Sequence, residues 1–246
     1  MKIKYAINWI RLCFMITGLF LIMALKTAHA DSPFRADDFV IMPDLISGLN
    51  GKEIQKHEIS YAQYNALHSQ LPRENQKPWG ADDCGLKRDI KKEKYNSTNY
   101  PATCISFNDA EAYIRVLNTL DNKYEYRLLT QKEFTQLVNL TFSVITNNNS
   151  KVSVAQINKY AWIDSYSTSN NHPHPVCTKI SIFGLCDILG NLWEWTSPEA
   201  TDSAPLVFGG GWDHSAMYLT SSLRFSQRNI RSFIAGFRLV RTAKNF

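Results

Sequence analysis

The chain has 246 residues, of which 27 are Lys or Arg and 22 are Asp or Glu, giving a formal net charge of +5. Residues 1–30 hold four of the basic residues and no acidic one, so the remainder carries a net charge of only +1. This near-neutral balance removes the main support for nucleic-acid binding, which requires a basic surface.

Residues 1–30 have the organisation of a secretory signal peptide. Lys2, Lys4 and Arg11 form a basic start, CFMITGLFLIMAL is an apolar run, and residues 28–30 (AHA) place small residues at the cleavage positions. The run is short for a membrane-spanning helix. We therefore expect cleavage, a periplasmic or secreted bacterial protein, and no stable membrane anchor; the alternative is an uncleaved anchor.

Residues 31–246 are predicted to form one domain, because their number suits a single core and no Pro/Gly/Ser-rich linker interrupts them. Four cysteines follow the signal segment: Cys84, Cys104, Cys177 and Cys186. An even number in an oxidising compartment favours disulfides. We predict local pairing, 84 with 104 and 177 with 186; a metal or redox site is the alternative, although no Cys-x-x-Cys occurs.

The first elements are a strand and a helix. FVIMP (39–43) predicts a short strand, followed by a polar turn region. In EISYAQYNALHSQL (58–71) the apolar side chains approach helical spacing, so its second half predicts an amphipathic helix. Residues 72–100 predict a long surface loop, in which the charge run KRDIKKEK (87–94) forms a solvated face.

Two further helices have start signals. In ISFNDAEAYIRVLNTL (105–120), Asn108 and Glu111 have the spacing of a capping box, in which two side chains satisfy free backbone N–H groups. In RLLTQKEFTQLV, Thr130 and Glu133 have the same spacing and predict a short helix. After about residue 140 no helical period continues, and short apolar runs alternate with Gly, Asn, Ser and Pro. The expected fold class is α+β with little regular structure.

Taken in order, six stretches resemble the formylglycine-generating-enzyme (sulfatase-modifying-factor) domain family. They are EISYAQYNAL (58–67), YPATCISFNDAEAYIRVLN (100–118), YRLLTQKEF (126–134), HPVCTKISIFGLCDILGNLWEWT (174–196), GGGWDHS (209–215) and GFRLVRT (236–242). The family also includes ergothioneine sulfoxide synthases and a periplasmic pyoverdine-maturation protein. The resemblance implies a variant of the C-type lectin fold: a small twisted antiparallel sheet, two to three helices and much irregular chain.

The resemblance also implies a structural calcium site. Carried over position by position, its ligands are the Asp187 and Glu194 side chains and the Gly190 and Leu192 carbonyls. Oxygen donors of this kind suit calcium. The alternative is that Glu194 pairs with a buried arginine such as Arg238 while Asp187 caps a turn. In either case an arginine within an apolar strand predicts a structural, partly buried role for Arg238.

Formylglycine formation in this family uses a copper ion held by two cysteines just after the GG-x-W segment, and Cu(I) prefers thiolates. In this chain the family's two cysteine positions fall near His214 and Ala216, and no cysteine follows Cys186. We expect neither copper binding nor formylglycine formation. Asp213 and His214 are the best candidates for a surviving base or ligand; a solvent-facing polar loop is the alternative. His172 and His174 form a conceivable metal pair, but a turn is favoured.

Three functions fit this pattern. The first is a non-catalytic module that presents residues 209–235 to a protein, peptide or glycan. The second is a periplasmic oxidoreductase or maturation enzyme resembling the pyoverdine branch. The third is an accessory subunit of a surface or secretion complex. The missing cysteines favour a family member without formylglycine activity, and whether it is an enzyme stays open.

Overall fold

The computed structural model describes residues 32–44, 46, 48–76, 84, 99–147, 153–164, 172–198 and 204–244. The predicted signal peptide and the charge run 87–94 lie outside these residues. Pro33–Phe246 form one unit by their contacts, distinct from Met1–Ser32. Within the described ranges, no helix is both long and apolar enough to cross a membrane.

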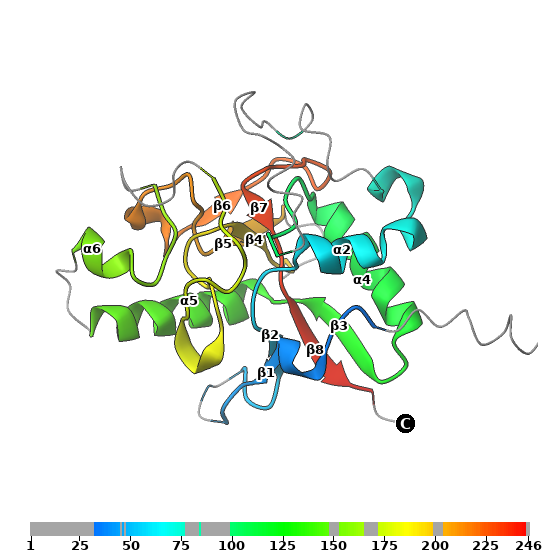
Figure 1. Cartoon of the computed structure of the whole chain (residues 1–246), viewed down its shortest axis with the longest axis horizontal. Helices are drawn as coiled ribbons and strands as arrows, with labels where there is room; N and C mark the ends of the chain where they lie inside the picture. Colours follow the sequence, from blue (N-terminus) through cyan, green and yellow to red (C-terminus); the bar gives the residue numbers. More distant parts are fainter. Residues whose placement is uncertain are drawn as a thin grey trace, which may run out of the picture. The chain divides into compact units, whose positions relative to one another are not determined.

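Two four-stranded sheets form the framework (Figure 1). The first is antiparallel, with the order β1 (Phe39–Ile41), β2 (Glu53–Gln55), β8 (Leu239–Ala243) and β3 (Tyr124–Leu128). The second has the order β6 (Ser222–Arg224), β5 (Leu206–Phe208), β4 (Trp193–Trp195) and β7 (Ala235–Gly236). The expected α+β class is confirmed. The sheet is divided in two, however, and β4 pairs with β7 in parallel.

The α-helices are α2 (Tyr61–Ala66), α4 (Phe107–Leu120), α5 (Gln131–Thr146) and α6 (Val154–Ile157). Short 3₁₀ segments cover Ala36–Asp38 (η1), His68–Gln70 (η2), Arg73–Asn75 (η3), Ile182–Gly184 (η4) and Ala216–Tyr218 (η5). Among the described residues, the sequence predicted α4 and α5 but not α6. It placed the first helix in the second half of residues 58–71, whereas α2 lies in the first half and a 3₁₀ segment follows it. It also underestimated α5, which continues to Thr146 and ends where Asn147 adopts a left-handed backbone with φ of 49°.

Helix α4 begins with a different capping box from the predicted one. Ser106, not Asn108, is the N-cap: its Oγ accepts from the Asp109 backbone N–H at 3.1 Å, and Asp109 accepts from the Ser106 N–H at 2.9 Å. Asp109 also binds Arg231, with Nε–Oδ2 at 2.8 Å. This buried carboxylate therefore joins the helix start to the chain that enters β7, which the local motif did not indicate.

Helix α5 starts as predicted, with Thr130 as the N-cap and Glu133 completing the capping box. Glu133 additionally accepts two hydrogen bonds from Arg127, at 2.7 and 2.8 Å, and one from Lys52 at 2.6 Å. Burial on its own raises the pKa of Glu133, but these donors outweigh it and lower the pKa from 4.5 to about 2. The helix start is thus joined electrostatically to β3 and to the turn before β2.

Because the pKa of Glu133 is lowered in the folded protein, the unfolding free energy depends on pH. A carboxylate whose pKa is lower in the folded state stabilises the protein fully above its unfolded value, near 4.5, and the effect disappears as pH falls towards 2. Because Arg127 and Lys52 are partly exposed, we expect a contribution of about 1–3 kcal/mol. Glu133→Gln should flatten the pH dependence of the unfolding free energy between these values. The exposed Glu125→Gln is the control, and an unchanged slope in the Glu133 variant would contradict the assignment.

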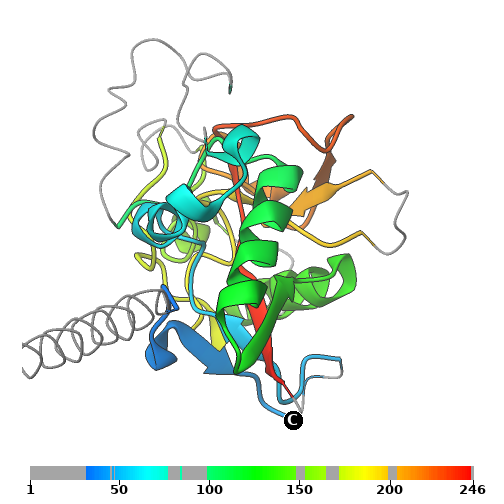
Figure 2. The same ribbon diagram turned by 90° about the vertical axis from the view of Figure 1, so that its right-hand side faces the viewer.

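Helices α2 and α4 lie side by side (Figure 1, Figure 2). Tyr64 and Tyr113 stack with ring centroids 5.2 Å apart, and Phe237 contacts both edge-on, at 6.5 and 5.7 Å. All three rings are buried. This aromatic contact fixes the segment between β7 and β8, which carries Arg238 into the interior.

Candidate functional site

Strand β4 carries Trp-Glu-Trp through the second sheet with all three side chains buried. Trp195 donates from Nε1 to the Ile105 carbonyl at 2.9 Å and meets Phe107 edge-on. Because its hydrogen-bonding group is satisfied inside the core, Trp195 anchors the strand. The strand thereby holds Glu194 in the interior.

Glu194 pairs with Arg238. The parallel register places Gly236 of β7 opposite Glu194, and Arg238 follows two residues later. The guanidinium donates from Nε to Oε2 at 2.7 Å and from Nη2 to Oε1 at 2.5 Å. Both side chains are completely buried. The predicted structural role of Arg238, paired with a carboxylate, is confirmed.

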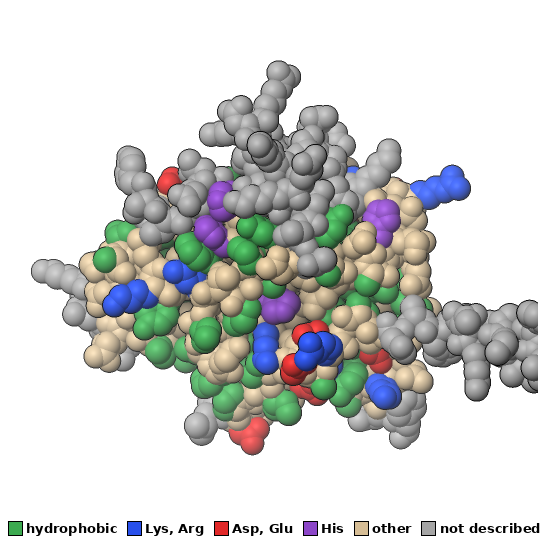
Figure 3. All heavy atoms as spheres, in the orientation of Figure 1, with side chains coloured by type: hydrophobic (Ala, Val, Ile, Leu, Met, Phe, Trp, Pro, Cys, Tyr) green, Lys and Arg blue, Asp and Glu red, His purple; other side chains and the backbone are tan. Residues whose placement is uncertain are grey.

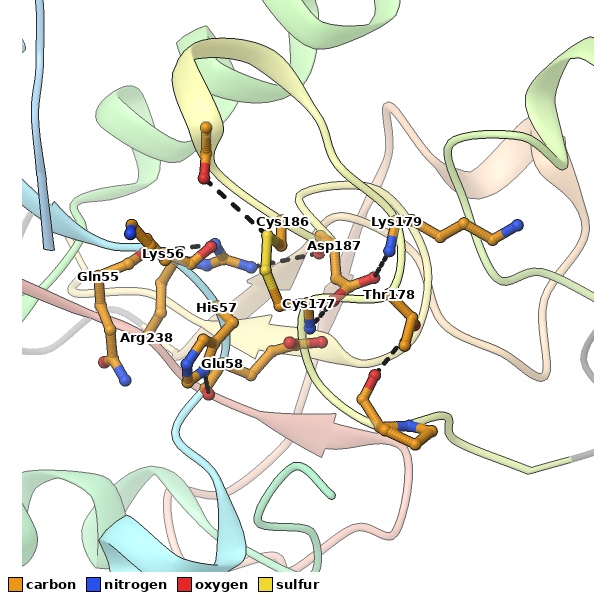
Figure 4. Close-up of a disulfide and its surroundings, with 12 residues drawn as sticks. Gln55, Lys56, His57, Glu58, Cys177, Thr178, Lys179, Cys186, Asp187 and Arg238 are labelled. Carbon is orange, nitrogen blue, oxygen red and sulfur yellow. Dashed lines mark hydrogen bonds between the residues drawn. A yellow bond between two sulfur atoms is a disulfide. The ribbon is translucent and has the colours of Figure 1, made fainter. Parts of the chain in front are cut away.

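Asp187 organises the loop closed by the Cys177–Cys186 disulfide (Figure 4). Its backbone is left-handed, with φ of 52°. Its carboxylate accepts backbone N–H groups from Cys177 at 2.6 Å and from Lys179 at 3.1 Å. Burial raises the pKa of Asp187 to about 6, although Arg238 and these N–H donors oppose the rise. The contacts are those of a turn-capping carboxylate.

The four predicted calcium ligands therefore lie close in the fold, but their side-chain oxygens are engaged. Both oxygens of Glu194 accept from Arg238, and both oxygens of Asp187 accept from backbone N–H groups. Calcium takes six to eight oxygen ligands, and a cation would have to displace a bidentate guanidinium to reach Glu194. In this arrangement the residues do not fit calcium, and the calcium site stays an untested prediction.

Glu58 is a buried carboxyl group that the sequence did not single out. Its Oε1 accepts from Asn191 Nδ2 at 2.9 Å, while its Oε2 is buried without a hydrogen-bond partner. Burial, with Asp187 and Glu194 nearby, raises its pKa well above the ordinary value. Burial also lowers the pKa of the neighbouring His57. The only sequence signal was a glutamate two residues before the helix cap Ser60, which does not reveal a partner 133 residues away.

Asn191 connects the Glu58 carboxyl group with the segment of His174. Its left-handed backbone, with φ of 61°, follows Gly190. Its side-chain Oδ1 accepts from the His174 backbone N–H at 2.8 Å, and its carbonyl accepts from the Trp212 N–H at 2.9 Å. The Asn191 backbone N–H donates to the Trp162 carbonyl at 2.9 Å. Asn191 thus joins the segments of His174 and Trp162 to the GGGWDHS stretch, which contains Trp212.

Asp213 and His214 form a pair beside Trp193. Asp213 Oδ1 lies 2.7 Å from His214 Nδ1, and each side chain is 24% exposed. Tyr218 of η5 meets the imidazole edge-on at 5.1 Å. The His214 backbone is fixed by its own N–H to the Gly211 carbonyl and by the Asp164 N–H to its carbonyl. The backbone that carries this imidazole is therefore fixed by two hydrogen bonds.

The contacts of His214 identify its tautomer. Trp193 Nε1 also approaches Nδ1, at 3.3 Å, but one nitrogen cannot donate to Asp213 and accept from Trp193 together. We assign the proton to Nδ1, because the Asp213 contact is shorter and involves a carboxylate. No described residue hydrogen-bonds Nε2. In this tautomer Nε2 carries a lone pair that can accept a proton or a hydrogen bond from a donor group of a ligand.

The order of these features along the chain agrees with one family. The model of the sulfatase-modifying factor enzyme 1-like domain (FGE-sulfatase) matches residues 35–243. The chain belongs to this family. Among curated proteins, none has a matching sequence.

Several solved structures share the FGE-sulfatase fold. CarF is 21% identical, with a TM-score of 0.59 over 80% of this chain and 88% of CarF. PvdO from Pseudomonas aeruginosa is 17% identical, with a TM-score of 0.60 over 82% of this chain and 90% of PvdO. The variable protein 1 of Treponema denticola is 18% identical, with a TM-score of 0.56 over 78% and 84%. At these identities the likeness concerns the fold.

The disulfides of this FGE-sulfatase domain match the predicted local pairing. Cys84 bonds Cys104, and Cys177 bonds Cys186. The first disulfide packs with Trp212 and neighbouring apolar side chains, close to the GGGWDHS stretch. Every cysteine that the structure describes is therefore a disulfide partner, which is typical of an oxidising compartment.

The two histidines before the GLCDILGN segment lie against a tryptophan. His174 stacks on Trp162 with ring centroids 3.6 Å apart, and His172 lies 4.8 Å from His174. Lys179 Nζ lies over the Trp162 ring at 4.0 Å. The structure thus brings the predicted pair together at a packed surface loop. Among the described residues, no group of three metal-ligating side chains gathers there or elsewhere.

Proposed function

We propose that this protein is an exported FGE-sulfatase-family domain that binds a ligand at residues 209–235 and does not generate formylglycine. The observation that carries the proposal is the Asp213–His214 pair after the GG-x-W stretch. It stands where the family's copper chemistry needs thiolates, and the four described cysteines are consumed by disulfides. Carboxylate and imidazole do not replace a thiolate pair for Cu(I).

Export rests on the predicted signal peptide together with the disulfides. Two disulfides in one domain suit the periplasm or the extracellular space. The charge distribution agrees with a ligand other than nucleic acid. Figure 3 shows acidic, basic and apolar side chains mixed on one face, without a continuous basic stripe among the side chains described there.

The surface beside His214 suits recognition. Met217 is 74% exposed and Tyr218 is 39% exposed, and both belong to η5. Methionine and tyrosine are adaptable contact residues enriched at interfaces. The imidazole Nε2 adds a directional acceptor beside them. A peptide, protein or glycan segment with a donor group and apolar surface would match this combination.

A second candidate function is that of a periplasmic oxidoreductase or maturation enzyme of the kind expected from the pyoverdine branch. The Asp213–His214 contact favours it, because a carboxylate that orients an imidazole is a common arrangement for general base catalysis. The four described cysteines are held in the two disulfides. In this second candidate function a bound cofactor or an external oxidant accepts the electrons of the substrate.

The expected result with formylglycine substrates is negative. The purified protein is incubated with Cu(I) and a cysteine-containing sulfatase peptide, and the peptide is analysed by mass spectrometry. We expect the cysteine to remain unconverted, because no described thiolate pair is available to hold copper. A formylglycine generator of the same family is the positive control, and copper-dependent conversion would contradict the proposal.

Ligand binding is tested by screening the wild-type protein on peptide and glycan arrays beside the variant Met217→Ala/Tyr218→Ala. We expect at least one ligand whose signal falls about tenfold or more in the variant, as for exposed contact residues at a binding centre. Ile41→Ala is the matched control, because Ile41 is 69% exposed but lies on β1. Equal signals for wild type and the η5 variant on every ligand would count against this surface.

A further inference from the structure

Three buried acidic side chains from separate parts of the chain interact electrostatically, although they do not gather closely enough to form a metal-ligating group. Glu58 precedes α2, Asp187 directly follows Cys186 and Glu194 lies on β4. Placing ionisable carboxyl groups together in this way requires a compensating positive charge.

Arg238 supplies that charge, and its donors are saturated. Besides the two bonds to Glu194, its Nη2 donates to the Asp187 carbonyl at 3.2 Å. Its Nη1 donates to the Lys56 carbonyl at 3.1 Å and to the Gln55 carbonyl at 3.5 Å. The guanidinium has five N–H donors in a planar fork, and five acceptors surround it. One side chain thereby joins the end of β2, Asp187 beside the disulfide, and β4. Figure 4 shows Arg238 with Gln55, Lys56 and Asp187.

A divalent cation at the same place would meet two obstacles. Among the described residues, Glu58 Oε2 is the one buried carboxylate oxygen without a hydrogen-bond partner, whereas calcium needs six to eight oxygens. The cation would also stand beside a buried guanidinium of like charge, which is unfavourable at low dielectric.

We propose that Arg238 acts as the internal cation of this domain and performs the cross-linking that a bound calcium ion would otherwise provide. The fold is then complete without a divalent cation. The acceptors that surround Arg238 are carbonyl and carboxylate oxygens, the same kind of donor atom that a hard cation takes. A covalently attached cation does this without dependence on calcium concentration. This inference is independent of the ligand proposed for residues 209–235.

The test compares melting curves of the mature protein in EGTA and in calcium chloride, together with calorimetric titration of calcium chloride. We expect no saturable heat of binding, and melting temperatures in EGTA and in calcium chloride that agree within about 1 °C. A true calcium site, at a free calcium concentration 100 times its dissociation constant, would raise the melting temperature by about 5–10 °C. The result that overturns the proposal is stoichiometric calcium binding with a rise in melting temperature, both lost in Glu194→Gln.

Discussion

Arg238→Met is expected to lower the unfolding free energy by about 3–5 kcal/mol, because it leaves a buried carboxylate without its counter-charge. Glu194 accepts two of the guanidinium's hydrogen bonds, and three backbone carbonyls accept the others. All of these acceptors would lose their donor together. Denaturant unfolding with the disulfides intact measures the change through the transition midpoint.

The matched control is Arg35→Met, because Arg35 pairs with Asp37 on the surface, where their side chains are 79% and 62% exposed. An exposed pair contributes about 0–1 kcal/mol, so this variant should unfold nearly as the wild type does. The double variant Arg238→Met/Glu194→Leu should lose less than the two single losses added together, because it removes both charges. A loss below 1 kcal/mol in Arg238→Met would contradict the central role of this pair.

Gly190→Ala is expected to cost about 3–5 kcal/mol, from backbone strain plus a steric clash. Gly190 has φ of +77°, and a Cβ there would stand 2.3 Å from the Trp162 carbonyl oxygen and 2.7 Å from its nitrogen. These are backbone atoms, so no side-chain rotation relieves the clash. Separating the two segments would weaken the bonds from Gly190 N–H to the Gly209 carbonyl and from Asn191 N–H to the Trp162 carbonyl.

Gly51→Ala separates strain from clash. Gly51 has a similar φ of +68°, but a Cβ there meets nothing within 4 Å. It should therefore cost only the left-handed backbone penalty of about 1–2 kcal/mol. Equal losses for the two variants, measured by denaturant unfolding, would mean that the close approach of Gly190 to Trp162 contributes nothing.

Local signals predicted the elements whose causes are local. Thr130 and Glu133 start α5 as expected, because a capping box involves residues three apart. Both disulfides join cysteines no more than 20 positions apart, so the assumption of local pairing predicted them correctly. Arg238 was recognised as structural because an arginine among apolar residues needs a partner, although it lies between β7 and β8 and not within a strand.

The sequence failed where a residue's role depends on distant partners. Ser106 and Asp109 form a capping box with the same local spacing as the predicted Asn108 and Glu111, so spacing alone did not decide between them. The contact of Asp109 with Arg231, 122 positions away, had no local signal. Glu58 meets Asn191 across 133 positions, through a left-handed turn that no periodicity indicates. The Asp213–His214 pair is adjacent in sequence and was found, but its contact with Trp193 depends on the fold.

For the candidate calcium site, the sequence left two interpretations open, and calcium binding stays an untested prediction. The resemblance implied Asp187 and Glu194 as cation ligands, whereas their contacts are with Arg238 and backbone N–H groups. The same oxygens could bind a metal ion or accept hydrogen bonds. In this arrangement the positive charge beside the Glu194 carboxylate is the guanidinium of Arg238.

Elemental analysis of the protein, purified without chelators from a host that exports it, tests the central claim most directly. The account holds that Arg238 stabilises the scaffold in place of calcium and that Asp213 and His214 stand where copper chemistry would need cysteines. It predicts both metals far below one equivalent per chain. One equivalent of calcium would contradict the role given to Arg238, and one equivalent of copper would contradict the proposed function.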